Sequence, residues 1–182
     1  MEKNMNEDFL KSNAYVDVYE LSRTKDTISG RVLLSDMPRL QDLILQSNKA
    51  LQFTICGIVG KEGWPGATVT LSGDVPLVCN RCNQPMSFEM NREVVFRFAK
   101  SESEANQIPI EEDDDIEIVV GSTKMNLLEW LEEEALLSLP LVPMHLEQCI
   151  EPLHIRLGED EENEKKNPFA QLKEMKNLRK AD

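Results

Sequence analysis

Residues 67–98 read ATVTLSGDVPLVCNRCNQPMSFEMNREVVFRF and are the most informative part of the sequence for the fold. It contains two segments in which apolar and polar residues alternate, separated by Cys79-Asn80-Arg81-Cys82. Such alternation is typical of strands with one buried face. We therefore predict a β-hairpin that carries a CxxC pair at its tip, where two thiolates can bind a metal or exchange a disulfide.

Both predicted strands place their apolar residues on one side. The residues expected to face the core are Ala67, Val69, Leu71, Val75 and Leu77 in the first strand, and Met86, Phe88, Met90, Val94, Phe96 and Phe98 in the second. The opposite sides carry mostly hydroxyl, amide and charged side chains. Both strands are therefore expected to be half-buried and antiparallel.

Similar patterns elsewhere predict further strands at 15–20, 28–34, 51–59 and 116–120. The four-residue segment Ser35-Asp36-Met37-Pro38 predicts a helix start, with Ser35 or Asp36 as the cap and Pro38 in the first turn. The apolar residues expected to face inward from that helix are Leu40, Leu43 and Ile44.

A second helix is predicted after Asn126, with Asn126 as its cap and Glu129 as a capping-box partner. Its inward face is expected to hold Leu128, Leu131, Ala135 and Leu139, while Glu132, Glu133 and Glu134 mostly point outward. Pro140 and Pro143 are expected to end it.

These elements predict an α+β fold: an antiparallel sheet that can curl toward a barrel, two to three helices, and a flexible basic C-terminal tail. The predicted organisation is a flexible N-terminus at 1–13, one domain at 14–157 with an acidic loop at 101–115, and an acidic linker with a basic helix at 158–182. A length of 182 residues suits one domain with a substantial core.

The composition of the chain argues against a membrane protein, an exported protein and a disulfide-rich protein. The apolar runs fall short of the ~20 residues that a membrane span needs, and the polar start lacks the pattern of an export signal. Four cysteines in such a chain do not indicate a disulfide framework. We expect a cytoplasmic protein.

Charge is distributed unevenly along the chain. The formal net charge is −13, but residues 1–100 are neutral, residues 101–164 carry −17 and residues 165–182 carry +4. The acidic block would repel a phosphate backbone and could attract a basic protein such as a ribosomal protein, or it could be a solvated loop without a partner.

The CxxC pair has two further candidate ligands in the chain, His145 and Cys149. If residues 145–149 are helical, both side chains lie on one face and can meet the hairpin tip. Cys79 and Cys82 would then complete a Cys3His set, a common composition of structural zinc sites.

Two other interpretations of the cysteines stay open. They could be ordinary semi-buried thiols, or the CxxC could be redox-active. A redox CxxC of the thioredoxin type opens a helix, whereas Pro85 and an alternating strand follow here, and this disfavours redox chemistry. Asn83, directly after the second cysteine, tolerates the left-handed backbone of a tight turn.

The sequence shows no enzyme signature, so we expect neither catalysis nor a small-molecule substrate.

The C-terminal tail is predicted to form a short helix after Asn167-Pro168. Its candidate contact residues for RNA or a partner groove are Phe169, Leu172, Lys173, Lys176, Arg179 and Lys180. A helix this short is marginal alone and would need a partner to order. The alternative is a frayed terminus that folds back on the domain.

Three motifs in order resemble the bacterial YceD family, the large ribosomal RNA subunit accumulation proteins. They are Val78-Cys79-Asn80-Arg81-Cys82, the segment from Leu136 to His145 with Cys149, and Asn167-Pro168-Phe169-Ala170. The resemblance runs from about residue 28 onward. The Cys-x-Arg-Cys and His/Cys positions of the family fall on Cys79, Arg81, Cys82, His145 and Cys149.

The resemblance implies a role in the synthesis, processing or stability of 23S rRNA, and hence in large-subunit assembly. Because the sequence shows no enzyme signature, we expect this role to be non-enzymatic. It implies a ribosomal protein or a 23S rRNA precursor as the partner. The alternative hypothesis is a zinc-stabilised protein-interaction module without a direct ribosomal role.

Overall fold

A computed structural model describes residue 10 and residues 14–60, 62–109 and 116–150. The predicted C-terminal helix, with its candidate contact residues, and nearly all of the predicted N-terminal tail lie outside this part of the chain. None of the helices within it has the length and apolar character to cross a membrane.

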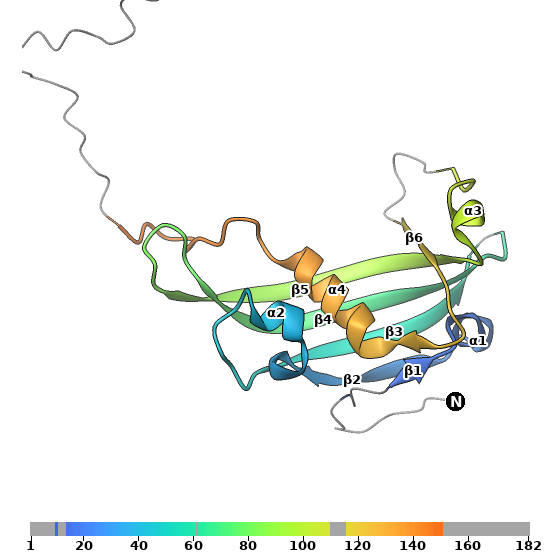
Figure 1. Cartoon of the computed structure of the whole chain (residues 1–182), viewed down its shortest axis with the longest axis horizontal. Coiled ribbons are helices and arrows are strands. Elements are labelled where there is room, and N and C mark those ends of the chain that lie inside the picture. The colour runs from blue at the N-terminus through green and yellow to red at the C-terminus, as the bar shows by residue number, and fades with distance from the viewer. Residues whose placement is uncertain (1–9, 11–13, 61, 110–115, 151–182) are drawn as a thin grey trace, which may run out of the picture. The chain divides into compact units, whose positions relative to one another are not determined.

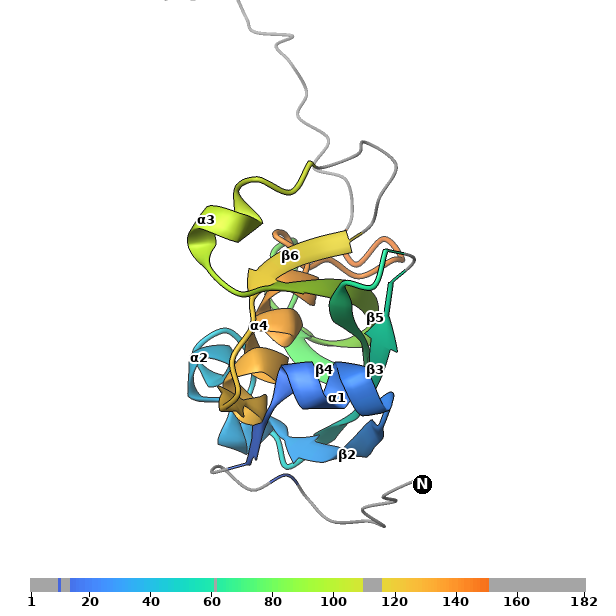
Figure 2. The ribbon, with the colours of Figure 1, turned by 90° about the vertical axis from the view of Figure 1, so that its right-hand side faces the viewer.

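The fold is built on a five-stranded sheet (Figure 1). Its strands, in spatial order, are β2 (Thr27–Leu33), β3 (Ala50–Val59), β4 (Pro65–Val78), β5 (Pro85–Ala99) and β6 (Ile116–Val120). Figure 2 shows the sheet curving around helix α4 (Leu127–Ser138), with β2 and β6 far apart. Among the described strands these two form the edges and do not pair, so the curvature does not proceed to a barrel.

The β4–β5 hairpin confirms the prediction from the alternating segments. Its register pairs Val69 with Val94 and continues to Val78 opposite Pro85 at the tip. All five apolar residues predicted to face inward from β4 are buried, as are Met90, Val94, Phe96 and Phe98 of β5. Apolar residues thus face apolar residues across the strands, which fixes the register because a one-residue slip would expose them all.

Strand β6 corrects the expectation of a wholly antiparallel sheet, because it pairs with β5 in the parallel direction. A parallel pair needs a crossover connection, and the segment between β5 and β6 provides one. That segment also contains a short helix, α3 (Glu102–Ala105), where only a loop was predicted. Alternation predicts that a strand exists, but it does not give the direction of pairing.

The predicted strand at 15–20 is largely wrong. Only Tyr15–Val16 (β1) is extended, pairing with β7 (Met125–Asn126), and helix α1 (Val18–Thr24) follows. Asp17 explains the difference, because its carboxylate accepts hydrogen bonds from the backbone N–H groups of Tyr19 and Glu20 and caps the helix.

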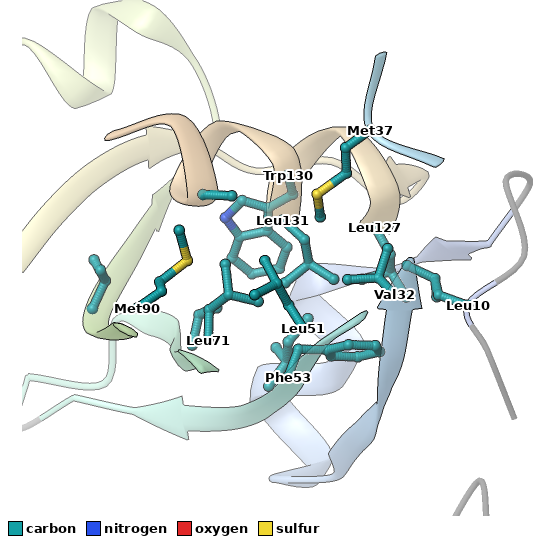
Figure 3. Packing of buried hydrophobic residues seen from close by; sticks show 14 of the residues in the cluster. Leu10, Val32, Met37, Leu51, Phe53, Leu71, Met90, Leu127, Trp130 and Leu131 are labelled. Atoms are coloured by element: carbon teal, nitrogen blue, oxygen red, sulfur yellow. The ribbon is translucent and has the colours of Figure 1, made fainter. Parts of the chain in front are cut away.

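Helix α4 packs against the concave face of the sheet. Its Trp130 contacts Phe96 and Phe98 edge-on, with ring centroids 5.1 and 5.9 Å apart. Figure 3 shows Trp130 and Leu131 projecting toward the strand residues of the core. Asn126 caps the helix as predicted by accepting from the N–H of Leu128. Its side-chain amide donates to the carboxylate of Glu129, in place of the backbone bond of a capping box.

The outward placement predicted for the three glutamates of α4 is wrong for two of them. Glu132 and Glu134 are each only 3% exposed. Glu132 accepts from the backbone N–H groups of Arg39 and Leu40, at 2.7 and 3.2 Å, and from Arg39 Nε at 3.0 Å. Glu134 lies 3.5 Å from Arg92 Nε.

Glu132 also explains why the predicted caps at Ser35 and Asp36 are wrong. These residues belong to a 3-10 turn (Leu34–Asp36), and helix α2 (Pro38–Gln41) follows without a side-chain cap from its own N-terminus. A carboxylate from α4 takes that role instead. Of the predicted inward residues of this helix, Leu40 is buried but Leu43 is 60% exposed, because α2 ends at Gln41.

Candidate metal centre

The tip of the β4–β5 hairpin is closed by backbone hydrogen bonds of Cys79. Its N–H donates to the carbonyl of Gln84, and its carbonyl accepts from the N–H of Asn83, at 2.9 and 2.8 Å. Asn83 has a φ of 57°, which confirms the left-handed conformation predicted for it. The turn therefore holds Cys79 and Cys82 in fixed positions.

A second segment, residues 139–150, reaches this tip after α4 ends. Figure 1 shows it in orange, running from α4 along the end of the hairpin. The N–H of Asn80 donates to the carbonyl of Pro143 at 2.8 Å, which attaches the segment to the turn. Residues 145–149 are irregular, so the helical arrangement considered for them does not form. The predicted convergence of His145 and Cys149 on the tip is nevertheless observed.

The ligand atoms of Cys79, Cys82, His145 and Cys149 all lie within 4.8 Å of one another. The Sγ atoms of Cys79 and Cys149 are 3.8 Å apart, and Cys82 Sγ is 3.4 Å from His145 Nδ1. Two thiolates bound to one zinc ion at about 2.3 Å in tetrahedral geometry would be about 3.8 Å apart. Both the composition and the spacing of the cluster fit a zinc ion.

The imidazole of His145 is held from its other side. Its Nε2 lies 3.3 Å from the carbonyl of Pro85, the first residue of β5. A proton on Nε2 would be donated to this carbonyl and would leave the Nδ1 lone pair directed at the cluster. Histidine ligands of metals are commonly oriented by a hydrogen bond of this kind.

Arg81, between the two cysteines of the tip, binds the second segment directly. Its Nε donates to Cys149 Sγ at 3.0 Å, and a terminal nitrogen donates to the backbone carbonyls of His145, at 2.9 Å, and Glu147. The guanidinium thus supplies a positive charge beside the thiolates and also fixes the path of the chain that carries two of the ligands. Its hydrogen bond with Cys149 is the main cause of its own raised pKa.

The electrostatics of the cluster favour thiolates at two positions. Burial of Cys79 opposes its ionisation, but the surrounding backbone N–H groups, that of His145 first, lower the pKa of this thiol to about 5. Burial likewise opposes ionisation of Cys149, yet the hydrogen bond from Arg81 lowers its pKa. The thiolate is the form that binds metal.

The other two members respond to these charges. The pKa of Cys82 is raised, by burial first and then by its cysteine neighbours. The pKa of His145 is raised by its contacts with Cys149 and Cys79. Three sulfur groups and one imidazole around a common centre thus share few protons. A divalent cation would take the place of these protons and bind all four groups in their deprotonated forms.

The structure also bears on the rival interpretations of the cysteines. The CxxC leads through a turn into strand β5 and not into a helix, so it lacks the helix N-terminus that activates a thioredoxin-type thiol. Ordinary packing thiols would not need an arginine and a histidine directed at them. The contacts of Arg81 were not predicted; the available signals were its place between the two cysteines and its match to the Cys-x-Arg-Cys position of the resemblance.

No solved structure matches the chain. A sequence model of one protein family, described as large ribosomal RNA subunit accumulation protein YceD, matches residues 67–176. This range is more than half of the chain and includes nearly all of the hairpin, the segment that meets its tip, and the three motifs on which the resemblance was based. It begins later than residue 28, where the resemblance was expected to start. The chain belongs to the YceD family.

Proposed function

We propose that this protein is a non-catalytic factor in the synthesis, processing or stability of 23S rRNA, and so in assembly of the large ribosomal subunit. Membership of the YceD family supports this proposal, since the family is described by the accumulation of large-subunit ribosomal RNA. The partner would be a ribosomal protein or a precursor of 23S rRNA.

The Cys3His centre is the structural observation that carries the non-catalytic part of the proposal. Cys79, Cys82, His145 and Cys149 would fill all four positions of a tetrahedral zinc ion. Catalytic zinc sites keep one position open for water or substrate, whereas structural sites are closed. We therefore propose that the centre binds one zinc ion, which joins the hairpin tip to residues 139–150.

Two regions of the chain differ in net charge and therefore suit different partners. The block at 101–164 has a net charge of −17 and would favour a basic protein over a phosphate backbone. The segment at 165–182 has a net charge of +4 and is the part suited to RNA. The contact residues proposed there are Phe169, Leu172, Lys173, Lys176, Arg179 and Lys180.

A deletion strain of the source organism tests the proposed function. We expect less 23S rRNA and a smaller 50S peak on a sucrose gradient, with both restored by a plasmid that carries the wild-type chain. Normal 23S levels and an intact 50S peak in the deletion strain would contradict the proposal. That result would favour a zinc-stabilised interaction module without a direct ribosomal role.

A further inference from the structure

Residues 139–150 expose apolar side chains in an unusual pattern. Large apolar residues that are exposed alone occur on most protein surfaces, and the described strands and loops carry a few of them. Residues 141–150 instead contain five, with exposed fractions from 46% to 105%: Leu141, Val142, Met144, Leu146 and Ile150. We call these five residues the apolar row.

The apolar row follows from the way the segment is attached to the hairpin tip. Every second residue from Pro143 to Cys149 makes a contact with the tip, through a carbonyl, a ligand side chain or both. The alternate residues Val142, Met144 and Leu146 remain outside these contacts and are exposed, as is the polar Gln148. The contacts with the tip thus use polar atoms, and three apolar side chains are left on the outside of the segment.

Leu141 and Leu146 give the clearest evidence that the apolar row is available to a partner. Their side chains are 100% and 105% exposed, while the core residues on α4 and the strands are almost fully buried. An exposed leucine forgoes the stabilisation that burial of its side chain would give. A group of exposed large apolar side chains within one short segment is typical of an interaction site.

The charge around the apolar row indicates which partner fits. The chain from Met125 to Ile150 contains five glutamates and no lysine or arginine, and Glu147 lies exposed within the row itself. Arg81, which contacts this segment, already binds Cys149 and two carbonyls. A phosphate backbone or an anionic lipid surface would find no free cation in this segment, and a second copy would bring like charges together.

We propose that the apolar row is a docking surface for a basic protein segment that carries apolar side chains of its own. The apolar side chains of the partner would cover Leu141, Val142, Met144 and Leu146, and its cations would face Glu147 and the glutamates of α4. This inference rests on the proposed function for the class of partner, the basic proteins of the large ribosomal subunit. The metal centre serves the surface by fixing the segment from its inner side.

The test uses the full-length, zinc-loaded protein coupled to a resin, and proteins extracted from purified large subunits and freed of RNA. Retained proteins are identified by mass spectrometry, and the strongest is purified for titration. The double variant Leu141→Ser/Leu146→Ser removes the two most exposed leucines. A matched control, Leu43→Ser/Val59→Ser, removes two apolar residues that are exposed elsewhere on the described surface.

We expect wild type and the control to retain the same basic protein, and the row variant to bind it at least about tenfold more weakly with its zinc content unchanged. Equal binding by the row variant would overturn the proposal. Failure of wild type to retain any large-subunit protein would overturn it as well, even if the deletion strain shows the 50S defect. The proposed function would then survive without this docking surface.

Two single substitutions test the charge of the partner. Leu146→Lys should weaken binding more than Leu146→Glu, because the partner is basic. The reverse order would overturn the assignment of a basic partner. Light scattering of the free protein provides the remaining check, since a dimer that Leu146→Lys dissociates would assign the row to a second copy.

Discussion

The core around α4 and the tip of the β4–β5 hairpin are held together by different physical interactions. Around α4, Trp130 and Leu131 are buried among apolar strand residues, and the hydrophobic effect supplies most of the stability. At the tip, an irregular segment meets a turn through backbone hydrogen bonds, one arginine and the four side chains of the Cys3His cluster. The apolar residues of that segment mostly face solvent.

This difference suggests that the two regions can be disrupted separately. Loss of metal should release residues 139–150 and leave the sheet folded, while loss of a core side chain should destabilise the whole domain without changing the ligand set.

The substitution Cys82→Ser removes one ligand of the centre. We expect the zinc content to fall from about one equivalent to nearly none, because a structural site needs its full ligand set. Hydrogen exchange should become fast in residues 139–150 and stay slow in α4. Cys56→Ser is the matched control, since Cys56 is not part of the cluster. Equal exchange in both variants would mean that the metal does not hold the segment.

The substitution Trp130→Ala is the reciprocal change in the core. It should lower the free energy of unfolding by about 3–5 kcal/mol, because it leaves a cavity beside Phe96 and Phe98. Urea unfolding measures this loss, and zinc content should stay at one equivalent while the protein is folded. Trp64→Ala, at a partly buried position beneath Arg97, should have a smaller effect. Loss of zinc from folded Trp130→Ala would show that the two regions are coupled.

The substitution Glu132→Ala should lower the free energy of unfolding by about 1–3 kcal/mol, because it leaves the N–H groups of Arg39 and Leu40 without their acceptor. Glu132→Gln keeps an acceptor oxygen and should restore part of this loss. Glu133→Ala, at the exposed neighbouring position, should change stability by no more than about 0.5 kcal/mol. If Glu132→Ala resembles this control in urea unfolding, the carboxylate does not cap α2.

The substitution Glu134→Gln should change how stability depends on pH. Burial raises the pKa of Glu134, with a contribution from Glu117, against the opposing effect of Arg92. The folded state therefore binds the carboxyl proton of Glu134 more tightly than the unfolded state does. The protonated carboxyl contributes stability at low pH, and this contribution is lost as pH rises above the ordinary glutamate pKa of about 4.3.

Glutamine cannot ionise, so Glu134→Gln should gain stability relative to wild type as pH rises from about 4 toward neutrality. Urea unfolding at several pH values measures the difference between the two proteins. A difference that stays constant with pH, or that shrinks as pH rises, would contradict the raised pKa.

The hairpin and the four members of the cluster at its tip could be predicted from the sequence because both depend on local pattern and residue type. Alternation from residue 67 to residue 98 requires two half-buried strands, and their register follows from keeping apolar residues on one face. Cysteine and histidine are the side chains that bind zinc, so Cys79, Cys82, His145 and Cys149 could be chosen without knowing the path between them.

The features that the sequence did not predict depend on contacts between distant segments. The burial of Glu132 follows from the position of α2, which lies more than 90 residues earlier in the chain. The direction of β6 depends on a crossover that the alternation does not encode. The irregular path of residues 145–149 is set by hydrogen bonds to Arg81, which helical spacing cannot reveal.

The central claim is that the four ligands at the hairpin tip hold one zinc ion. Metal analysis of the full-length protein, purified without a histidine tag, combined with X-ray absorption at the zinc edge, tests it most directly. We predict one zinc per chain, with three sulfur ligands at about 2.3 Å and one nitrogen ligand at about 2.0 Å. Less than half an equivalent of zinc, or a shell without sulfur, would contradict the claim.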